Sequence, residues 1–168
     1  MINVRTARML ADYKRWADQR LFDSLMALPP EELNRKRVSV FNNMIGALNH
    51  TYVVDCIWQA HLEGRGHDFK TSHGLLHTEL ADLRMAQQEI DQWFCGWSSA
   101  QTEESLDKPI EFTSMSGESG VMSAGGMLLH VVNHASYHRG WVIQMYFDIP
   151  AKPPITDLSE FLREVPGY

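Results

Sequence analysis

The chain has 168 residues, of which 44% are hydrophobic and 21% charged, and 21 Asp and Glu against 15 Lys and Arg give a net charge of −6. This length and composition suit a single domain over residues 1–168 that buries a hydrophobic core, and exclude a disordered tail. The acidic balance, with no basic run, argues against a nucleic-acid partner.

The start of the chain and its apolar runs predict a cytoplasmic protein with no membrane partner. The first ten residues, MINVRTARML, lack the apolar segment of a signal peptide, and no stretch approaches the ~18 apolar residues of a membrane span. The two cysteines, Cys56 and Cys95, lie far apart and indicate neither a disulfide framework nor a cysteine zinc site.

Apolar residues at three- and four-residue spacing predict four long helices. Asn42 or Asn43 is expected to cap the second helix, and Ser123 the fourth. The expected helices cover about residues 3–27, 43–63, 76–99 and 124–147. Four long helices in a chain of this length predict an all-α four-helix bundle.

Two shorter segments depart from this pattern. Residues 106–122 combine alternating apolar positions with Ser-Gly turn dipeptides, which predicts a short β-hairpin or an ordered loop before the last long helix. The tail after Pro153 and Pro154 predicts a helical turn that packs Leu158, Phe161 and Leu162 against the body of the protein.

Eight histidines are the unusual feature of the composition. His130, His134 and His138 follow one another at four-residue steps and form one stripe on the fourth helix. Two such histidines can share a metal ion, but the outer two lie ~12 Å apart along the axis, too far for a common ion. The spacing alone therefore allows either His130 with His134 or His134 with His138.

A third ligand would distinguish a metal site from buried histidines that serve only the core. His50, on the apolar side of the second helix, is one candidate, and His61 on the same helix is its rival. His73 and His77 also have the four-residue spacing, but they flank Gly74 near a helix start, where solvent-exposed rings are expected. We assign no role to His67, which the sequence places in a loop.

Three segments together resemble the DinB/YfiT-like family of metal-binding four-helix bundles. They are YKRWADQRLFDSLMALPPEEL, LNHTYVVDCIWQAHLEGR and GESGVMSAGGMLLHVVNHASYHRGWV, and the similarity extends over nearly the whole chain. The resemblance implies an up-down-down-up bundle, commonly a homodimer. It also implies that His50, His134 and His138 bind the metal, while His130 supports the site or the structure.

The resemblance also defines the expected chemistry. Three neutral imidazoles leave at least one position of a divalent ion open for a water or a thiolate, as in catalytic sites. We therefore expect a metal-dependent thiol transferase or hydrolase that acts on a small molecule, with a low-molecular-weight thiol as co-substrate in the first case. Zinc and nickel are the first choices of metal, with iron, copper and manganese as alternatives.

Three further residues are candidates near the expected site. Tyr137 could donate to a metal-bound oxygen, and Arg139 could hold an anionic substrate, although a helix-surface arginine is commonly only solvated. Asp55 could support a ligand on another helix. The alternatives to an enzyme are a non-catalytic metal-binding or stress-response protein, and an interaction bundle with structural histidines.

Overall fold

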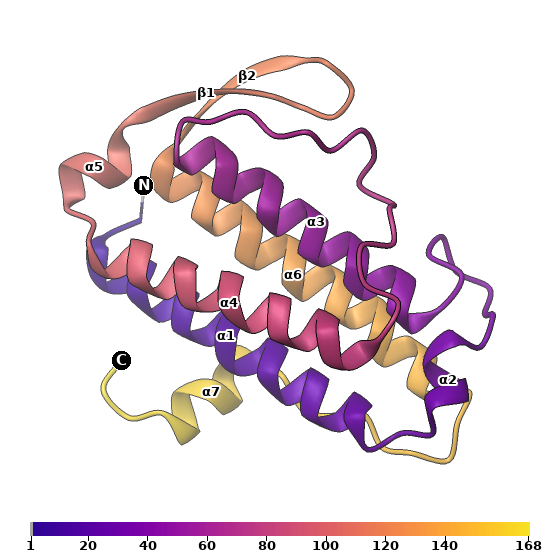
Figure 1. Cartoon of the computed structure of the whole chain (residues 1–168). Coiled ribbons are helices and arrows are strands. Elements are labelled where there is room, and N and C mark those ends of the chain that lie inside the picture. The colour runs from indigo at the N-terminus through magenta and orange to yellow at the C-terminus, as the bar shows by residue number, and fades with distance from the viewer. Residues whose placement is uncertain (1) are drawn as a thin grey trace.

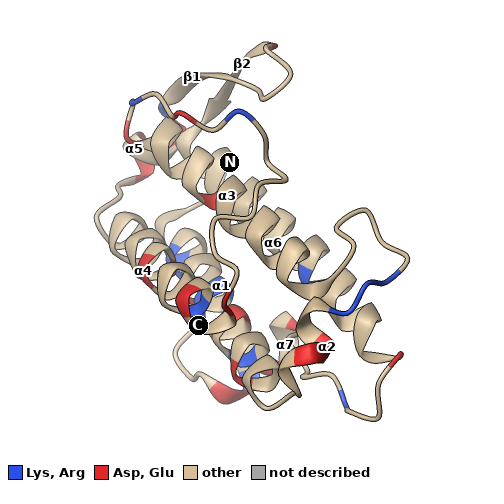
Figure 2. Ribbon diagram, turned by 45° about the vertical axis from the view of Figure 1, so that its right-hand side comes forward, with Lys and Arg blue, Asp and Glu red and all other residues tan. Residues whose placement is uncertain are grey.

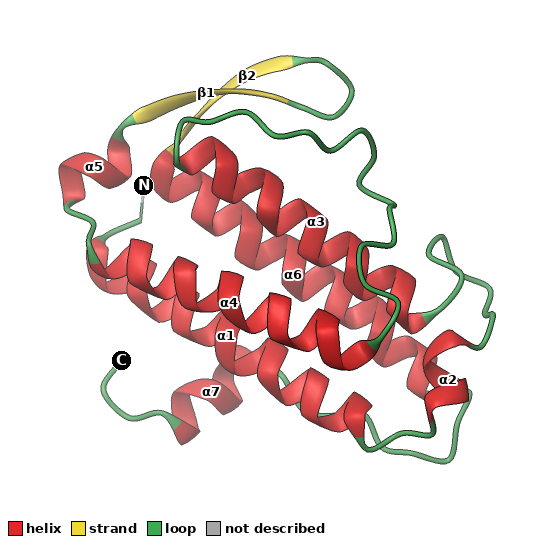
Figure 3. Cartoon of the chain, in the orientation of Figure 1, coloured by secondary structure: helices red, strands yellow, loops and turns green. Residues whose placement is uncertain are grey.

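The computed structural model describes residues 2–168 of the chain (Figure 1). These residues form seven helices and two strands, joined by loops. The four long helices are α1 (Val4–Met26), α3 (Met44–Leu62), α4 (Leu80–Ser99) and α6 (Ala124–Tyr146). The short helices are α2 (Pro30–Asn34), α5 (Glu103–Asp107) and α7 (Leu158–Glu164). Strands β1 (Pro109–Thr113) and β2 (Ser119–Ser123) form the one sheet of the described residues, and Figure 3 shows it at one end of the helices. This mostly helical structure fits the all-α class.

Side-chain caps begin three of the long helices. The side-chain oxygens of Asn3, Asn43 and Ser123 accept hydrogen bonds from backbone N–H groups in the first turns of α1, α3 and α6. Each cap satisfies a donor that has no partner within its helix. The expected Asn43 and Ser123 caps are thus confirmed.

The third long helix begins four residues later than the sequence predicts. Residues 76–79 stay outside α4, which starts at Leu80. The reason is the buried Asn49 of α3, whose Oδ1 accepts from the N–H groups of Leu76 at 2.9 Å and of His77 at 3.0 Å. These N–H groups point across to another helix, and the segment remains part of the loop formed by residues 63–79.

The predicted hairpin is confirmed. β1 and β2 pair antiparallel, with Pro109 opposite Ser123 and Thr113 opposite Ser119. Gly120 lies opposite Phe112, and a Cβ atom at Gly120 would come within 2.7 Å of the Phe112 ring, so a glycine lets the ring cross the sheet. The Phe112 ring also lies 5.1 Å from that of Trp58, which packs the hairpin against α3.

The long helices pack in pairs around two buried apolar clusters. α1 contacts α4 and α6, and α3 contacts α6 and α4. One cluster, near α5 and α7, includes Leu10, Phe94 and Leu128. The other, near α2, includes Leu25 and Leu83.

A buried polar cluster joins these helices. Lys14 of α1 is 1% exposed, and its Nζ lies 3.0 Å from Asp18, 2.7 Å from Asp55 and 2.6 Å from Asp91. Asp18 also forms an ion pair with Arg139 at 2.8 Å. The members, which come from all four long helices, are Lys14, Asp18, Asp55, Gln87, Asp91 and Arg139.

The charged residues are distributed unevenly over the long helices. Figure 2 shows several on α1 and α4, whereas the ribbon of α3 and α6 is almost entirely tan. Asp55 is the one charged residue of α3 and Arg139 the one of α6, and both belong to the buried polar cluster. The surfaces of α3 and α6 are therefore built from neutral side chains, histidines among them.

The C-terminal helix packs as predicted, with one exception. Phe161 of α7 is 1% exposed, and its ring lies 5.8 Å from Tyr13 and 5.7 Å from Trp16 of α1. Leu162 is 41% exposed, so the expectation that it packs inward is wrong. The helix turns Phe161 toward α1, and Leu162, one residue later, points to another side.

Among the described residues, none of the helices has the length and apolar character needed to span a membrane.

Candidate metal centre

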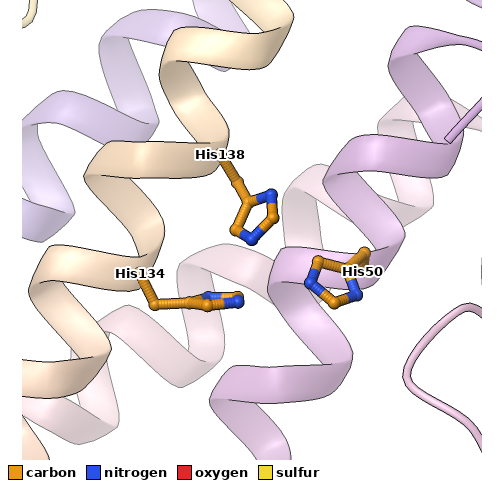
Figure 4. Close-up of side chains that lie close together, drawn as sticks. All are labelled: His50, His134 and His138. Atoms are coloured by element: carbon orange, nitrogen blue, oxygen red, sulfur yellow. The ribbon is translucent and has the colours of Figure 1, made fainter. Parts of the chain in front are cut away.

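Two neighbouring helices bring three histidines together. His50 comes from α3, and His134 and His138 come from successive turns of α6. One ring nitrogen from each lies within 4.8 Å of the others, and Figure 4 shows the rings pointing toward one another. The ring centroids are 4.5 Å apart for His50 and His138, 4.2 Å for His134 and His138, and 5.2 Å for His50 and His134. We call these residues the histidine triad.

Burial keeps the triad in its neutral form. His50 and His138 are 7% and 8% exposed, and His134 is partly buried. Burial, together with the neighbouring imidazoles, lowers the pKa of His134 to about 3 and that of His138 to about 4. Burial also lowers the pKa of His50. Neutral imidazoles have a free lone pair at neutral pH, which is the form that binds a metal ion.

The 63–79 loop determines the orientation of the His50 ring. Nδ1 of His50 lies 2.8 Å from the carbonyl oxygen of Ser72, and since a carbonyl only accepts, Nδ1 must carry the proton. The lone pair is then on Nε2. A hydrogen bond of this kind to the second nitrogen is typical of histidines that bind metals.

The other two histidines of the triad have unpaired atoms. Nδ1 of His134 and Nδ1 of His138 are buried and have no hydrogen-bond partner among the described residues. Unpaired buried polar atoms are costly and call for an explanation such as a bound ion. The donor set, its neutrality and these atoms together fit a divalent metal ion, and all-nitrogen ligation suits zinc, nickel, copper or iron.

Aromatic rings surround the triad. The ring of Phe41 lies 4.7 Å from His50 and 5.3 Å from His138. The rings of Tyr137 and Trp141 lie 5.0 Å and 6.5 Å from His138. Phe41 comes from the loop between α2 and α3, so a segment outside the long helices contributes to the surroundings of the triad.

Two of the expected supporting residues differ in their placement. His130 lies beside the triad, its ring 5.9 Å from His134 and 4.7 Å from Trp58. Asp55 points elsewhere: its Oδ2 lies 2.7 Å from Lys14 Nζ and accepts from Gln87 at 2.9 Å. The expectation that Asp55 supports a histidine is therefore corrected, because its carboxylate is part of the buried polar cluster.

Tyr137 and Arg139 flank His138 along α6 but point to different surroundings. Tyr137 is 60% exposed and presents its ring to His138. Arg139 is 4% exposed, and its guanidinium donates to Asp18, Tyr13 and Ser136. An arginine held this way is not a solvated surface residue, and its ion pair with Asp18 makes it a poor candidate for binding an anionic substrate.

The remaining histidines separate into two groups. His61 lies near the end of α3 with its ring 5.5 Å from that of His67, so the rival of His50 is not part of the triad. His73 is exposed, as expected, but its ring lies 5.1 Å from His50 and 5.6 Å from Phe41. Sequence reasoning missed this proximity, because helical periodicity says nothing about where a loop crosses a helix.

The fold and the triad together define a helical protein with a three-imidazole site that could hold a metal ion. The profile of the DinB family matches residues 1–165, and the chain belongs to this family. It is 32% identical over 146 residues to Protein DinB of Bacillus subtilis (strain 168), with 81% of each chain covered.

A solved structure has a similar fold. The crystal structure of a DinB-like protein from Bacillus cereus ATCC 10987 matches with a TM-score of 0.64, covering 86% of this chain and 91% of that one. The two sequences are 16% identical, so this likeness concerns the fold alone.

Proposed function

We propose that the protein is a divalent-metal enzyme that transfers a low-molecular-weight thiol to a small molecule, with the histidine triad as the metal ligands. The observation that carries the proposal is the convergence of three neutral imidazoles within 4.8 Å at the contact between α3 and α6. We propose zinc or nickel as the metal. Such an ion supplies a Lewis acid that stabilises a thiolate near neutral pH.

The residues around the triad support a sulfur-containing substrate. Sulfur makes favourable contacts with aromatic rings, and Phe41, Tyr137 and Trp141 all lie beside His138. Phe41 also covers His50 and limits the approach of water from that side. The hydrogen bond from His50 to Ser72 holds the His50 ring in one orientation.

The thiol is proposed to come from a co-substrate. Burial raises the pKa of Cys56 to about 11 and that of Cys95 to about 12, so both thiols stay protonated at neutral pH. A protonated, buried thiol is a poor nucleophile.

The proposal includes the topology of the bundle. We take α1, α3, α4 and α6 as an up-down-down-up four-helix bundle. In support, α1 and α6 run in one direction in Figure 1, and α3 and α4 run in the opposite one. This arrangement lets the histidines of α3 and α6 meet between two adjacent helices.

Cobalt substitution tests the proposal. Cobalt(II) is added to the metal-free protein, followed by 2-mercaptoethanol, and the near-ultraviolet and visible absorption is recorded. We expect a cobalt spectrum in the wild type, then a new thiolate-to-cobalt band on addition of the thiol. Neither should appear in the His138→Ala variant. Turnover is then measured with 2-mercaptoethanol and the electrophile 1-chloro-2,4-dinitrobenzene.

The outcomes separate the parts of the proposal. A wild type that binds no cobalt contradicts the metal centre. Bound cobalt without a thiolate band contradicts the thiol transferase and favours a hydrolase, in which water takes the place of the thiol.

A further inference from the structure

The 63–79 loop places a fourth imidazole next to the triad. The ring centroid of His73 lies 5.1 Å from that of His50, which is within the range of 4.2 to 5.2 Å found inside the triad. Phe41 stacks against both rings, at 4.7 Å and 30° for His50 and at 5.6 Å and 19° for His73. The His73 ring thus lies as close to the His50 ring as the His134 ring does.

The loop is held on both sides of His73. On one side the carbonyl of Ser72 accepts from His50 Nδ1 at 2.8 Å. On the other side the side chain of Asn49 accepts from the backbone N–H groups of Leu76 and His77. Residues 73–75 therefore run between one contact to His50 and another to Asn49, which are neighbours on α3. These two contacts keep the backbone at His73 close to the triad.

The His73 side chain is held less tightly than the histidines of the triad. It is exposed, and its ring nitrogen makes one contact with a side chain, at 3.3 Å from Ser72 Oγ. The ring nitrogens of His73 lie outside the set that converges within 4.8 Å. Rotation of an exposed side chain is a low-cost change, whereas moving a buried histidine of the triad would disturb the helix contacts.

We infer that His73 is a fourth, exchangeable ligand of the metal centre, which turns onto the ion in the absence of substrate and leaves when a substrate or thiol binds. This inference rests on the proposed metal centre. Tetrahedral coordination by four imidazoles would protect the ion, and release of one imidazole would open a single position. The exchange swaps one neutral ligand for another donor and involves no redox change.

Cobalt(II) binding distinguishes this role, because the visible spectrum of cobalt reports its ligands. The experiment compares the wild type, His73→Ala and His77→Ala by absorption and by competition with a chelator of known affinity. His77→Ala is the matched control, since His77 lies on the same loop but packs its ring 5.4 Å from Tyr52. We expect the His73→Ala variant to bind cobalt about 10- to 100-fold more weakly, with an altered spectrum. Free imidazole should restore its wild-type spectrum, and His77→Ala should behave as wild type.

Two results would overturn the inference. If His73→Ala and His77→Ala match the wild type in affinity and spectrum while His134→Ala binds no cobalt, the triad is the complete ligand set and the proposed function stands without His73. If the wild type binds no cobalt, both the metal centre and the fourth ligand are wrong.

Discussion

The side chain of Asn49 pairs with the backbone of His77 in both directions: Nδ2 donates to the His77 carbonyl at 2.8 Å, and Oδ1 accepts from the His77 N–H at 3.0 Å. Asn49 is fully buried beside His50, so this pair fastens the 63–79 loop to the helix that carries the first histidine of the triad.

Asn49→Ala should release this loop. The substitution leaves the N–H and C=O groups of His77 without their partner, which we expect to cost about 1–3 kcal/mol. Loosening the loop also weakens the Ser72 contact to His50, so metal affinity should fall about 10-fold. Limited proteolysis of residues 63–79 and a metal titration measure both effects. Thr51→Val is the control, because Thr51 bonds to Ala47 within α3, and equal proteolysis of the two variants would refute the role of Asn49.

Substitution of a triad histidine should remove the metal while the fold remains. His50→Ala, His134→Ala and His138→Ala should each reduce metal affinity by more than about 100-fold, since even a residue that only supports a ligand is worth about 10- to 100-fold. Elemental analysis and circular dichroism of each purified variant test this. His61→Ala is the control, because His61 lies on α3 outside the triad and should retain the metal. Full occupancy in any of the three variants would show that this histidine is not a ligand.

The metal-free protein should lose stability as the pH falls below about 6.5, the value for free histidine. Burial lowers the pKa of His134 to about 3 in the folded state, so the unfolded chain binds more protons between these two values. The free energy of unfolding therefore decreases as the pH is lowered from about 6.5 to about 3. Above about pH 6.5 the contribution of His134 to this free energy is constant. His134→Ala should gain on the order of 1 kcal/mol relative to the wild type between pH 7 and pH 5. Urea unfolding of the wild type and of His134→Ala at pH 7 and at pH 5 measures this gain. A stability difference between the two proteins that is the same at both pH values would contradict the prediction.

Removal of Lys14 should strongly destabilise the fold. Lys14→Ala leaves Asp18, Asp55 and Asp91 buried without their shared cation, which we expect to cost about 3–5 kcal/mol. Arg15→Ala is the control: Arg15 pairs with Asp12 at the surface, where an ion pair is worth about 1 kcal/mol or less. Urea unfolding measures the free energy of unfolding of both variants. Similar losses of stability in Lys14→Ala and Arg15→Ala would mean that the buried polar cluster contributes little to the stability of the fold.

Gly46 fixes the segment that carries Phe41. A Cβ atom at Gly46 would lie 2.3 Å from the Phe41 carbonyl oxygen, so Gly46→Ala should push this segment away and destabilise the protein by about 1–3 kcal/mol. Gly96 of α4 has open space around it, and Gly96→Ala should stabilise by about 0.5–1 kcal/mol. Thermal unfolding compares the two, and a neutral Gly46→Ala would show that the Phe41 segment can shift freely.

Helix positions could be predicted from the sequence because periodicity and capping are local signals. Asn43 and Ser123 cap helices where the sequence places them. The start of α4 was predicted too early, because the apolar spacing includes Leu76. In the structure the N–H of Leu76 donates a hydrogen bond to the side chain of Asn49, 27 residues earlier in the chain. A side chain distant in sequence decides this helix boundary.

The triad could be predicted only in part from local patterns. The stripe on α6 left His130 and His138 as equal partners of His134, since the choice depends on how α6 is rotated against α3. The resemblance to the family selected His138, and the geometry brings that residue together with His50. The i, i+4 spacing of Lys14 and Asp18 does not mark Lys14 as buried, because its other two partners, Asp55 and Asp91, lie on other helices. Arg139 was not marked as buried either, because its partner Asp18 lies on α1.

The buried polar cluster has a consequence for how the helices align. Each long helix supplies at least one member, so sliding any helix by one turn would leave a charge in the apolar interior without its partner. Apolar contacts tolerate such a shift far better, since one leucine replaces another. The cluster thereby selects one axial alignment of α3 against α6, and with it the single depth at which His50 faces His134 and His138.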